Sequence, residues 1–276
     1  MSVKSSLARK MLQIAKIAEW TSRLSGQLSL LEDQRISPFI LHERIENISS
    51  ELTIFDATPI GYIRLGDAGD GGYVVADCIR DNIGVLSLGV GDNVSFDLAI
   101  SKYIRNIHLY DHTVNGLPIS IPNSTFYREG LGNNDGFTSL NAAVARFENN
   151  QDLILKMDIE SAEWEIICSM GVDLLNRFSQ IIIEFHGLAR IVDEVLFQEM
   201  LTSFRNLNST HYLINTHANN YEPVKILGGF PLPNVIECTY LRKNEGTLIP
   251  IQNRLTHNLN KPNNGRNPES RSGFIY

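Results

Sequence analysis

Two acidic side chains come directly after an apolar run near the middle of the chain. Residues 153–157 read L-I-L-K-M, the pattern of a buried strand, and Asp158 and Glu160 follow before a helical pattern begins. In open α/β sheets the ligand lies beyond the carboxyl ends of the strands. Burial and neighbouring like charge shift the pKa of carboxylates in such a cleft, which suits them to proton transfer or to holding a cation. We interpret Lys156, inside the run, as a structural partner.

A second apolar run leads into glycines. Val85–Leu88 is followed by Gly89, Gly91 and Asp92, and then by a helix-like stretch. Glycines at a strand-to-helix turn let the backbone approach a ligand closely, with helix N–H groups facing that ligand. The third glycine of the dinucleotide pattern G-x-G-x-x-G is absent, because Val94 occupies its position. An ordinary tight turn is the alternative explanation for this stretch.

Asp111 adds a second feature of a cofactor site. It ends the run Ile107–Tyr110 and lies 20 positions after Gly91, the spacing expected for adjacent strands of a βαβ unit. A carboxylate there can accept hydrogen bonds from both hydroxyls of a ribose. The glycine turn and Asp111 together indicate an adenosine-containing cofactor, and NAD and S-adenosylmethionine are the two candidates.

These side chains must be positioned by short strands that alternate with helices. Such alternation favours an α/β fold with a mostly parallel, Rossmann-like sheet and helices on both faces. The predicted strands are Val85–Leu88, Ile107–Tyr110, Leu153–Met157, Gln180–Ile183, Tyr212–Ile214 and Val235–Leu241. The predicted helices are Phe96–Ile104, Leu140–Phe147, Trp164–Met170 and Val192–Phe204.

Several blocks of the sequence resemble one known family. Residues 155–166 read L-K-M-D-I-E-S-A-E-W-E-I and resemble the K-(I/M)-D-(I/V)-E-G-A-E block of the FkbM-type S-adenosylmethionine-dependent methyltransferases, with Ser161 in place of the family's glycine. Residues 64–74 resemble the R-x-G…D-G-G-Y stretch of one branch of that family, residues 87–97 its cofactor loop, and residues 182–186 its I-E-x-H strand end. The resemblance spans roughly residues 60–245.

The resemblance implies a seven-stranded class I methyltransferase sheet with S-adenosylmethionine as cofactor. Gly89 and Gly91 would then contact the methionine part of the cofactor, and Asp111 would hold its ribose. The adenine would meet the loop 130–137, although that Asn- and Gly-rich stretch fits a plain turn equally well. The predicted cofactor-binding residues are Asp70, Tyr73, Gly89, Gly91, Asp92, Asp111, Asp135, Phe137 and Asp158.

Methyl transfer to a hydroxyl requires a base, because the hydroxyl loses its proton as the new bond forms. His186 follows Glu184 by two residues at a predicted strand end, and His217 lies in a polar cluster after another strand. Any one of these histidines could instead form hydrogen bonds within the domain. Asp158, Glu184 and His186 also offer oxygen and imidazole ligands, and we predict that they hold Mg2+ or another divalent cation. The predicted catalytic residues are His186, His217, Glu160 and Asp158.

Together these features predict an S-adenosylmethionine-dependent O-methyltransferase. The expected acceptor is a small polar molecule, such as a sugar, a nucleotide-linked sugar, or a polysaccharide or natural-product precursor. An NAD-dependent oxidoreductase is the alternative enzyme, and the missing third glycine and the acidic block after residue 157 disfavour it. A non-catalytic cofactor-binding scaffold is the alternative outside the enzymes.

The composition excludes several classes of protein. The 276 residues include 24 Lys and Arg and 31 Asp and Glu, which gives a net charge of −7. This balance and the lack of a D/N/S-P-P-Y/F block argue against a nucleic-acid partner. The three cysteines lie far apart and read as reduced thiols, so we expect a cytoplasmic protein. No apolar run approaches the ~18 residues of a transmembrane segment, and we expect no signal peptide.

Both ends of the chain differ from its middle. Residues 1–55 are predicted as an amphipathic helical segment that pairs two subunits into a homodimer, packs on its own domain or lies on a membrane surface. Residues 56–250 form the predicted methyltransferase domain, and residues 251–276, rich in Asn, Pro, Gly and Ser, a C-terminal arm. Five apolar residues of the first segment follow a heptad pattern: Ile14, Ile17, Leu24, Leu28 and Leu31.

Overall fold

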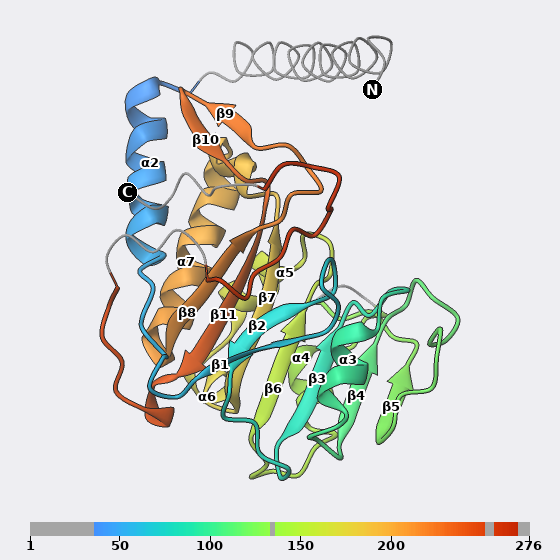
Figure 1. Ribbon diagram of the computed structural model, residues 1–276. Helices are drawn as coiled ribbons and strands as arrows, with labels where there is room; N and C mark the ends of the chain where they lie inside the picture. The colour runs from blue at the N-terminus through green and yellow to red at the C-terminus, as the bar shows by residue number, and fades with distance from the viewer. Residues whose placement is uncertain (1–35, 133–135, 252–256, 270–276) are drawn as a thin grey trace, which may run out of the picture.

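The computed structural model describes residues 36–132, 136–251 and 257–269. Its centre is a seven-stranded sheet with the strand order β5-β4-β3-β6-β7-β11-β8 (Figure 1). The bounds of these strands, in chain order, are Gly84–Leu88 (β3), Ile107–Tyr110 (β4), Ser124–Tyr127 (β5), Leu153–Met157 (β6), Phe178–His186 (β7), His211–Ala218 (β8) and Val235–Arg242 (β11).

The strand order and directions define the topology of this sheet. The strands β3, β4, β5, β6 and β7 run parallel, whereas β11 is antiparallel to both of its neighbours, β7 and β8. Counted along the chain, the sheet strands lie in the order 3-2-1-4-5-7-6 with the seventh reversed. This is the arrangement of the Rossmann-like class I methyltransferase fold, which confirms the predicted fold class. The topological switch point lies between β3 and β6, where open α/β sheets bind ligands.

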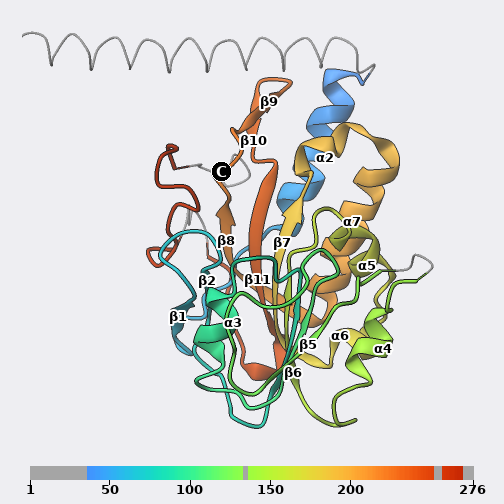
Figure 2. The same ribbon diagram turned by 90° about the vertical axis from the view of Figure 1, so that its right-hand side faces the viewer.

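Helices cover both faces of the sheet (Figure 2). Three clusters of buried apolar side chains pack between the sheet and the elements that cover it. One face carries α2 (Pro38–Glu51), α4 (Leu140–Val144), α5 (Glu163–Ser169), α6 (Val172–Leu175) and α7 (Glu194–Thr210). The other carries α3 (Ser95–Ile100) and the hairpin of β1 (Tyr62–Leu65) and β2 (Tyr73–Ala76). A second hairpin, β9 (Lys225–Leu227) and β10 (Phe230–Leu232), and two 3-10 turns, Leu188–Val192 and Lys243–Glu245, complete the described elements.

Apolar runs explain where the central strands form. Every residue of β3 and of β6 is buried, as expected for parallel strands that are covered on both faces. The helix α7 has 17 residues and begins after Asp193, whose side chain accepts the N–H of Leu196 (3.1 Å). Such a cap satisfies one of the backbone N–H groups that the first turn of a helix leaves unpaired.

The described structure contains all six predicted strands and extends four of them, β3 and β11 by a single residue each. The strands β7 and β8 continue from their apolar runs into polar residues, so Glu184 and His217 lie inside the sheet rather than in loops after it. The strand β5 was missed because its sequence, S-T-F-Y, is partly exposed and contains no apolar run. The predicted helices over residues 96–104 and 140–147 end earlier, at Ile100 and Val144.

The helix α2 belongs to the helical layer of the domain. The buried guanidinium of Arg44 donates to the carbonyl oxygens of Ile191 and Val192 (2.9 and 2.8 Å) and pairs with Glu194 at the start of α7. Residues 36–51 therefore pack against α7, although they fall within the predicted N-terminal segment. The heptad pattern of residues 14–31, and dimerisation through it, lie outside the described residues.

Of the predicted C-terminal arm, the structure describes residue 251 and residues 257–269, and the latter lie against β8 and β11 without forming a helix or strand. Side-chain amides attach it: Asn260 bonds to Asn215 of β8, and Asn263 donates to Glu237 of β11. No helix in the described part of the chain is long and apolar enough to cross a membrane.

Candidate functional site

A cavity of about 350 Å³ lies at the topological switch point. Its walls come from the ends of β3, β4 and β6, the loop before β2 and the segment between β5 and α4. This volume falls within the range of small-molecule sites. All eight predicted cofactor-binding residues that the structure describes line the cavity, and Asp135 lies outside the described residues. They are Asp70, Tyr73, Gly89, Gly91, Asp92, Asp111, Phe137 and Asp158.

The turn after β3 requires glycine at two positions. Gly89 has a φ of +71°, and a Cβ at this position would lie 1.5 Å from the carbonyl oxygen of Asp158. The carbonyl oxygen of Gly89 accepts a bond from Lys156 Nζ (2.8 Å), which gives this buried lysine a structural role. Gly91 has a φ of +55° and faces open space. The turn therefore brings backbone without side chains to the cavity wall.

Asp111 holds this turn and remains available to a ligand. Its Oδ2 accepts the N–H of Gly91 (2.8 Å), and its Oδ1 accepts the N–H and the hydroxyl of Thr113 (2.7 and 2.6 Å). Burial would raise the pKa of Asp111, but the bonds from Thr113 and Gly91 outweigh burial and lower it. Asp111 is therefore an ionised acceptor at the end of β4, where a ribose site requires one.

An aromatic pair forms another part of the wall. The ring centroids of His112 and Phe137 lie 5.0 Å apart, and Phe137 remains 39% exposed. Its ring covers Gly130, where a Cβ would approach the ring to 2.9 Å. An exposed aromatic face beside a bare backbone offers a flat surface for a purine.

The described lining of the cavity is strongly acidic. Seven carboxyl side chains reach it, and Lys156 is the single Lys or Arg among the described lining residues. The ammonium of Lys156 is already bonded to Gly89 and to Asp158 Oδ2 (3.3 Å), while Glu129 pairs with Arg146 (3.0 Å). The cavity therefore favours a positively charged ligand over a phosphate. The seven residues are Asp70, Asp92, Asp97, Asp111, Glu129, Asp158 and Glu160.

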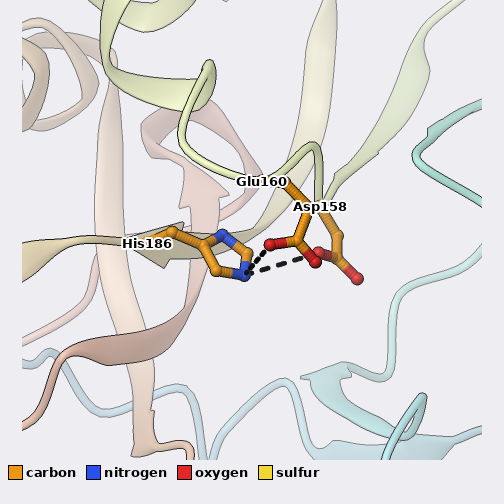
Figure 3. A group of neighbouring side chains, drawn as sticks. All are labelled: Asp158, Glu160 and His186. Atoms are coloured by element: carbon orange, nitrogen blue, oxygen red, sulfur yellow. Dashed lines mark ion pairs between the residues drawn. The ribbon is translucent and has the colours of Figure 1, made fainter.

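Asp158, Glu160 and His186 converge at the edge of this cavity (Figure 3). His186 Nε2 lies 3.9 Å from Asp158 Oδ1 and 3.7 Å from Glu160 Oε2. One ligand atom from each of the three residues lies within 4.8 Å of the other two. Two carboxylates and an imidazole at this separation are a donor set that suits a divalent transition metal or Mg2+.

The turn between β6 and α5 takes an uncommon conformation to present these carboxylates. Glu160 and Ser161 have φ angles of +57° and +86°. Left-handed conformations are unfavourable for residues other than glycine and are concentrated at functional sites. Ser161 occupies the glycine position of the FkbM-like block, and its positive φ explains in physical terms why glycine would suit that position.

His186 lies among four carboxylates. Its Nδ1 is 3.0 Å from Glu163 Oε1, and its Nε2 is 3.9 Å from Glu184 Oε1, in addition to the contacts with Asp158 and Glu160. Burial works against the charged ring, but the bond to Glu163 and the surrounding charges outweigh it and raise the pKa of His186 to about 9. At neutral pH this ring carries two protons unless a metal ion takes the place of one.

The strand register places four polar residues in one row across the sheet. Glu184 on β7 pairs with Glu237 on β11, which in turn pairs with His217 on β8. Asp158 follows the last paired residue of β6 and continues the row to the cavity. Residues directly opposite each other on neighbouring strands share a face of the sheet. The row therefore connects the cavity with the strands beneath the C-terminal arm.

Glu184 lies in the interior of this row. Its Oε1 accepts the amide of Asn219 (2.6 Å), and its Oε2 accepts the hydroxyl of Tyr73 (3.4 Å). Burial, followed by the charge of Asp158, raises the pKa of Glu184 well above its ordinary value. The structure thus places Glu160, rather than the predicted Glu184, with Asp158 and His186 in the donor set.

His217 lies outside the lining of the cavity. It is buried, and its ring nitrogens Nδ1 and Nε2 are bonded to Glu237 (3.1 Å) and Glu269 (2.8 Å). Burial opposes its protonation, but the bonds to these two carboxylates raise its pKa. These contacts fit the alternative of hydrogen bonding within the domain, so we leave His217 out of the proposed catalytic set.

Three residues that shape the site are absent from the predicted set: Glu163, Glu237 and Asn263. Glu163 contacts His186, and Asn263 donates to Glu237 and to Asp70 Oδ1 (3.4 Å), which connects the C-terminal arm to the cavity lining. The last glutamate of the FkbM-like block is the sequence signal for Glu163. Asn263 has no such signal, since 193 positions separate it from Asp70.

No family model matches this sequence, and no curated protein matches it either. Among solved structures, the chain is similar to an rRNA methylase from Streptococcus thermophilus, with 10% identity and a TM-score of 0.33 over 59% of this chain and 89% of that chain. It is also similar to the 23S rRNA methyltransferase ErmE, with 8% identity and a TM-score of 0.33 over 60% of this chain and 63% of that chain. The resemblance to the FkbM-type family stays a prediction.

Proposed function

We propose that this protein is an S-adenosylmethionine-dependent methyltransferase. The observation that carries the proposal is the acidic cavity at the switch point of a class I methyltransferase sheet, next to the glycine turn and Asp111. When bound, the cofactor would supply an electrophilic methyl group on a positively charged sulfonium. The carboxylates of Asp70, Asp158 and Glu160 complement that charge.

The residues present fit this cofactor part by part. Gly91 leaves room for its methionine portion, because a Cβ there would meet only open space, and Gly89 lets the turn pack directly against the backbone of Asp158 beside it. Asp111 can accept ribose hydroxyls with the lone pairs that Gly91 and Thr113 leave unused. Phe137, beside His112, offers its exposed face to the adenine.

The same lining argues against NAD. A dinucleotide brings a pyrophosphate to the first glycine turn, where backbone N–H groups and positive charge normally receive it. Here the turn lacks the third glycine, and Asp92 and Asp158 line the cavity beside it. Phosphates would lie among carboxylates, which is unfavourable in a partly buried site.

We propose that the methyl acceptor is a hydroxyl of a sugar or of a polysaccharide or natural-product precursor. When no cation is bound, Asp158 and Glu160 at the cavity edge would accept the proton of that hydroxyl, since His186, with a pKa of about 9, already holds its protons at neutral pH. Alignment of the hydroxyl with the methyl group would supply most of the rate. The acidic edge suits a neutral polyol better than a nucleotide-linked sugar, whose phosphates these carboxylates would repel.

We also propose that Asp158, Glu160 and His186 hold Mg2+ or another divalent cation. The donor set in Figure 3 carries two negative charges, and a metal ion would replace the proton on His186 Nε2. A divalent cation at this position would lower the pKa of a hydroxyl bound to it and orient that hydroxyl. Glu184 lies beside this set, because its Oε1 is 3.9 Å from the same ring nitrogen, His186 Nε2.

Calorimetric titration with S-adenosylhomocysteine, the demethylated cofactor, tests the first proposal. The wild-type protein should bind it saturably, and Asp111→Ala should weaken binding on the order of 100-fold, because a charged hydrogen-bond partner contributes about 1.5–3 kcal/mol. Asp81→Ala removes an exposed aspartate outside the cavity lining and serves as the matched control.

Other outcomes of this titration decide between the alternatives. Binding of NAD in place of S-adenosylhomocysteine would favour the oxidoreductase, and binding of neither would refute the cofactor assignment. Tight binding without turnover of any hydroxyl acceptor, with or without Mg2+, would favour the scaffold.

A further inference from the structure

Glu163, the first residue of α5, is fully buried, with 0% of its surface exposed. One of its carboxylate oxygens, Oε1, accepts the N–H of Ile159 (2.8 Å) and contacts His186 Nδ1 (3.0 Å). The other, Oε2, is buried without a hydrogen-bond partner. A buried carboxylate that is only half bonded is unfavourable for stability. Stability therefore does not explain why a glutamate occupies this position. Its two hydrogen-bond partners, Ile159 and His186, suggest another role.

The first partner belongs to the turn that carries two site carboxylates. The N–H of Ile159 lies between Asp158 and Glu160, and the carboxylate of Glu163, the first residue of α5, accepts it. This turn contains the left-handed residues Glu160 and Ser161, whose conformation requires support from surrounding contacts. The bond to Ile159 fixes the direction in which the turn presents both carboxylates.

The second partner is the imidazole of His186. For Nδ1 to bond to a carboxylate, Nδ1 must carry a proton, so Nε2 is the nitrogen that faces Asp158 and Glu160 (Figure 3). Trp164, the next residue of α5, donates its indole N–H to the carbonyl oxygen of His186 (2.7 Å). Two consecutive residues of one helix thus fix the side chain and the backbone of the same histidine.

We propose that Glu163 is the positioning residue of this site. One carboxylate oxygen of Glu163 bonds both to the turn that carries Asp158 and Glu160 and to the ring of His186. These two bonds hold the three side chains in orientations that face a common point. Buried carboxylate partners of this kind hold an imidazole in one tautomer when it binds a metal ion or transfers a proton. The purpose of the arrangement rests on the proposed function, whereas the arrangement itself can be tested without cofactor or metal.

The first test is nuclear magnetic resonance of the full-length, metal-free protein with 15N-labelled histidine. Once His186 is neutral at high pH, its ring should carry the proton on Nδ1, the less common tautomer of free histidine. Glu163→Met keeps the length of the side chain but removes the acceptor, so the proton should move to Nε2. Ser203→Ala removes a different buried bond to the same helix, from Ser203 Oγ to the carbonyl oxygen of Trp164 (3.0 Å), and should keep the wild-type tautomer.

The second test is titration with Mn2+ alone, followed by electron paramagnetic resonance. Loss of a buried partner of a ligating histidine lowers metal affinity about 10–100-fold, so Glu163→Met should lose that much and Ser203→Ala should stay near wild type. Glu163→Gln retains an amide oxygen for both bonds and should keep the Nδ1–H tautomer, which provides a second variant if Glu163→Met does not fold.

Three results would overturn or redirect the inference. A proton on Nε2 in the wild-type protein, or an unchanged tautomer in folded Glu163→Met, would overturn it. A proton on Nδ1 in a wild-type protein that binds no Mn2+ would support the positioning role and reject only the cation in the proposed function. Failure to bind S-adenosylhomocysteine would leave the tautomer result untouched.

Discussion

Four residues with left-handed backbone line one cavity in this molecule. Gly71, Gly89, Gly91 and Glu160 all have positive φ angles, and all four line the cavity. Tight turns of this kind bring main-chain atoms close to a ligand and direct polar side chains at it. At the scale of single residues, the backbone conformation therefore shapes the site as much as its carboxylate side chains do.

Gly89→Ala should damage both the fold and the cofactor site. A left-handed conformation costs an alanine about 1–2 kcal/mol, and the added Cβ would lie 1.5 Å from the carbonyl oxygen of Asp158. We expect the free energy of unfolding, measured by urea denaturation, to fall by at least that amount, and binding of S-adenosylhomocysteine to be lost.

Gly116→Ala is the matched control for this change, because a Cβ at Gly116 meets no atom within 4 Å and its φ is not left-handed. This variant should unfold within about 1 kcal/mol of the wild type. Equal losses in the two variants would show that the turn after β3 has no special requirement for glycine.

The sequence predicts single functional residues correctly where they come directly after an apolar run. Gly89, Asp111 and Asp158 each come within one or two residues of a predicted strand end, and all three line the cavity. The partners of the histidines could not be predicted in this way. Glu163 meets His186 across 23 positions and Glu269 meets His217 across 52, and only the packing of separate elements brings them together.

At the scale of elements, hydrophobic pattern predicts the centre of the sheet better than its edge. β3 and β6 are buried on both faces and read as mostly apolar runs, each interrupted by one polar residue, Ser87 and Lys156. The edge strand β5 is partly exposed and has no such run. The hydrophobic pattern also does not predict the polar ends of β7 and β8. These ends are buried by β11 and by the C-terminal arm, and the local sequence does not show that burial.

The junction of α7 and β8 contains a histidine that should make stability depend on pH. His211 is buried, with Nε2 bonded to the carbonyl oxygen of Phe178 (2.9 Å) and Nδ1 to the hydroxyl of Thr210 (2.7 Å). Burial lowers its pKa to about 4, from 6.5 for an unperturbed histidine. Between these values the unfolded chain binds a proton that the folded chain does not, so stability is complete above pH ~6.5 and falls as the pH drops toward 4.

For the single residue His211, this difference corresponds to about 2 kcal/mol between pH 7 and pH 5. His211→Gln should remove that part of the pH dependence when unfolding by urea is measured at both pH values. His42→Gln changes an exposed histidine of α2 and should keep the wild-type dependence. The same pH dependence in all three proteins would exclude His211 as its source.

At the scale of the whole molecule, both ends of the described chain pack on the central domain. α2 is held to α7 through Arg44, and the C-terminal arm is held to β8 and β11 through Asn260 and Asn263. The arm reaches the cavity lining through the contact of Asn263 with Asp70 (3.4 Å). The sequence predicts three segments with boundaries at residues 55 and 250. In the structure, the described parts of the first and last segments are hydrogen-bonded to the central domain.

Removal of residues 1–35 tests whether the heptad pattern joins two subunits. This deletion leaves Ser37, whose side chain accepts the N–H of Ile40 (3.2 Å) as the cap of α2, and also leaves the contacts of Arg44. If the heptad pairs two chains, light scattering should show the mass falling from that of a dimer to that of a monomer, with unfolding by urea unchanged. An equal mass before and after the deletion would exclude dimerisation through this segment.

The place of β11 in the sheet has a consequence for synthesis of the protein. It is the last sheet strand to be made, yet it pairs with β7 on one side and β8 on the other. Until residues 235–242 have left the ribosome, both neighbours expose a row of unpaired backbone N–H and C=O groups, and open edges of this kind recruit other chains. A chain interrupted before β11 would therefore expose unpaired edges on both β7 and β8. We expect such truncated chains to aggregate.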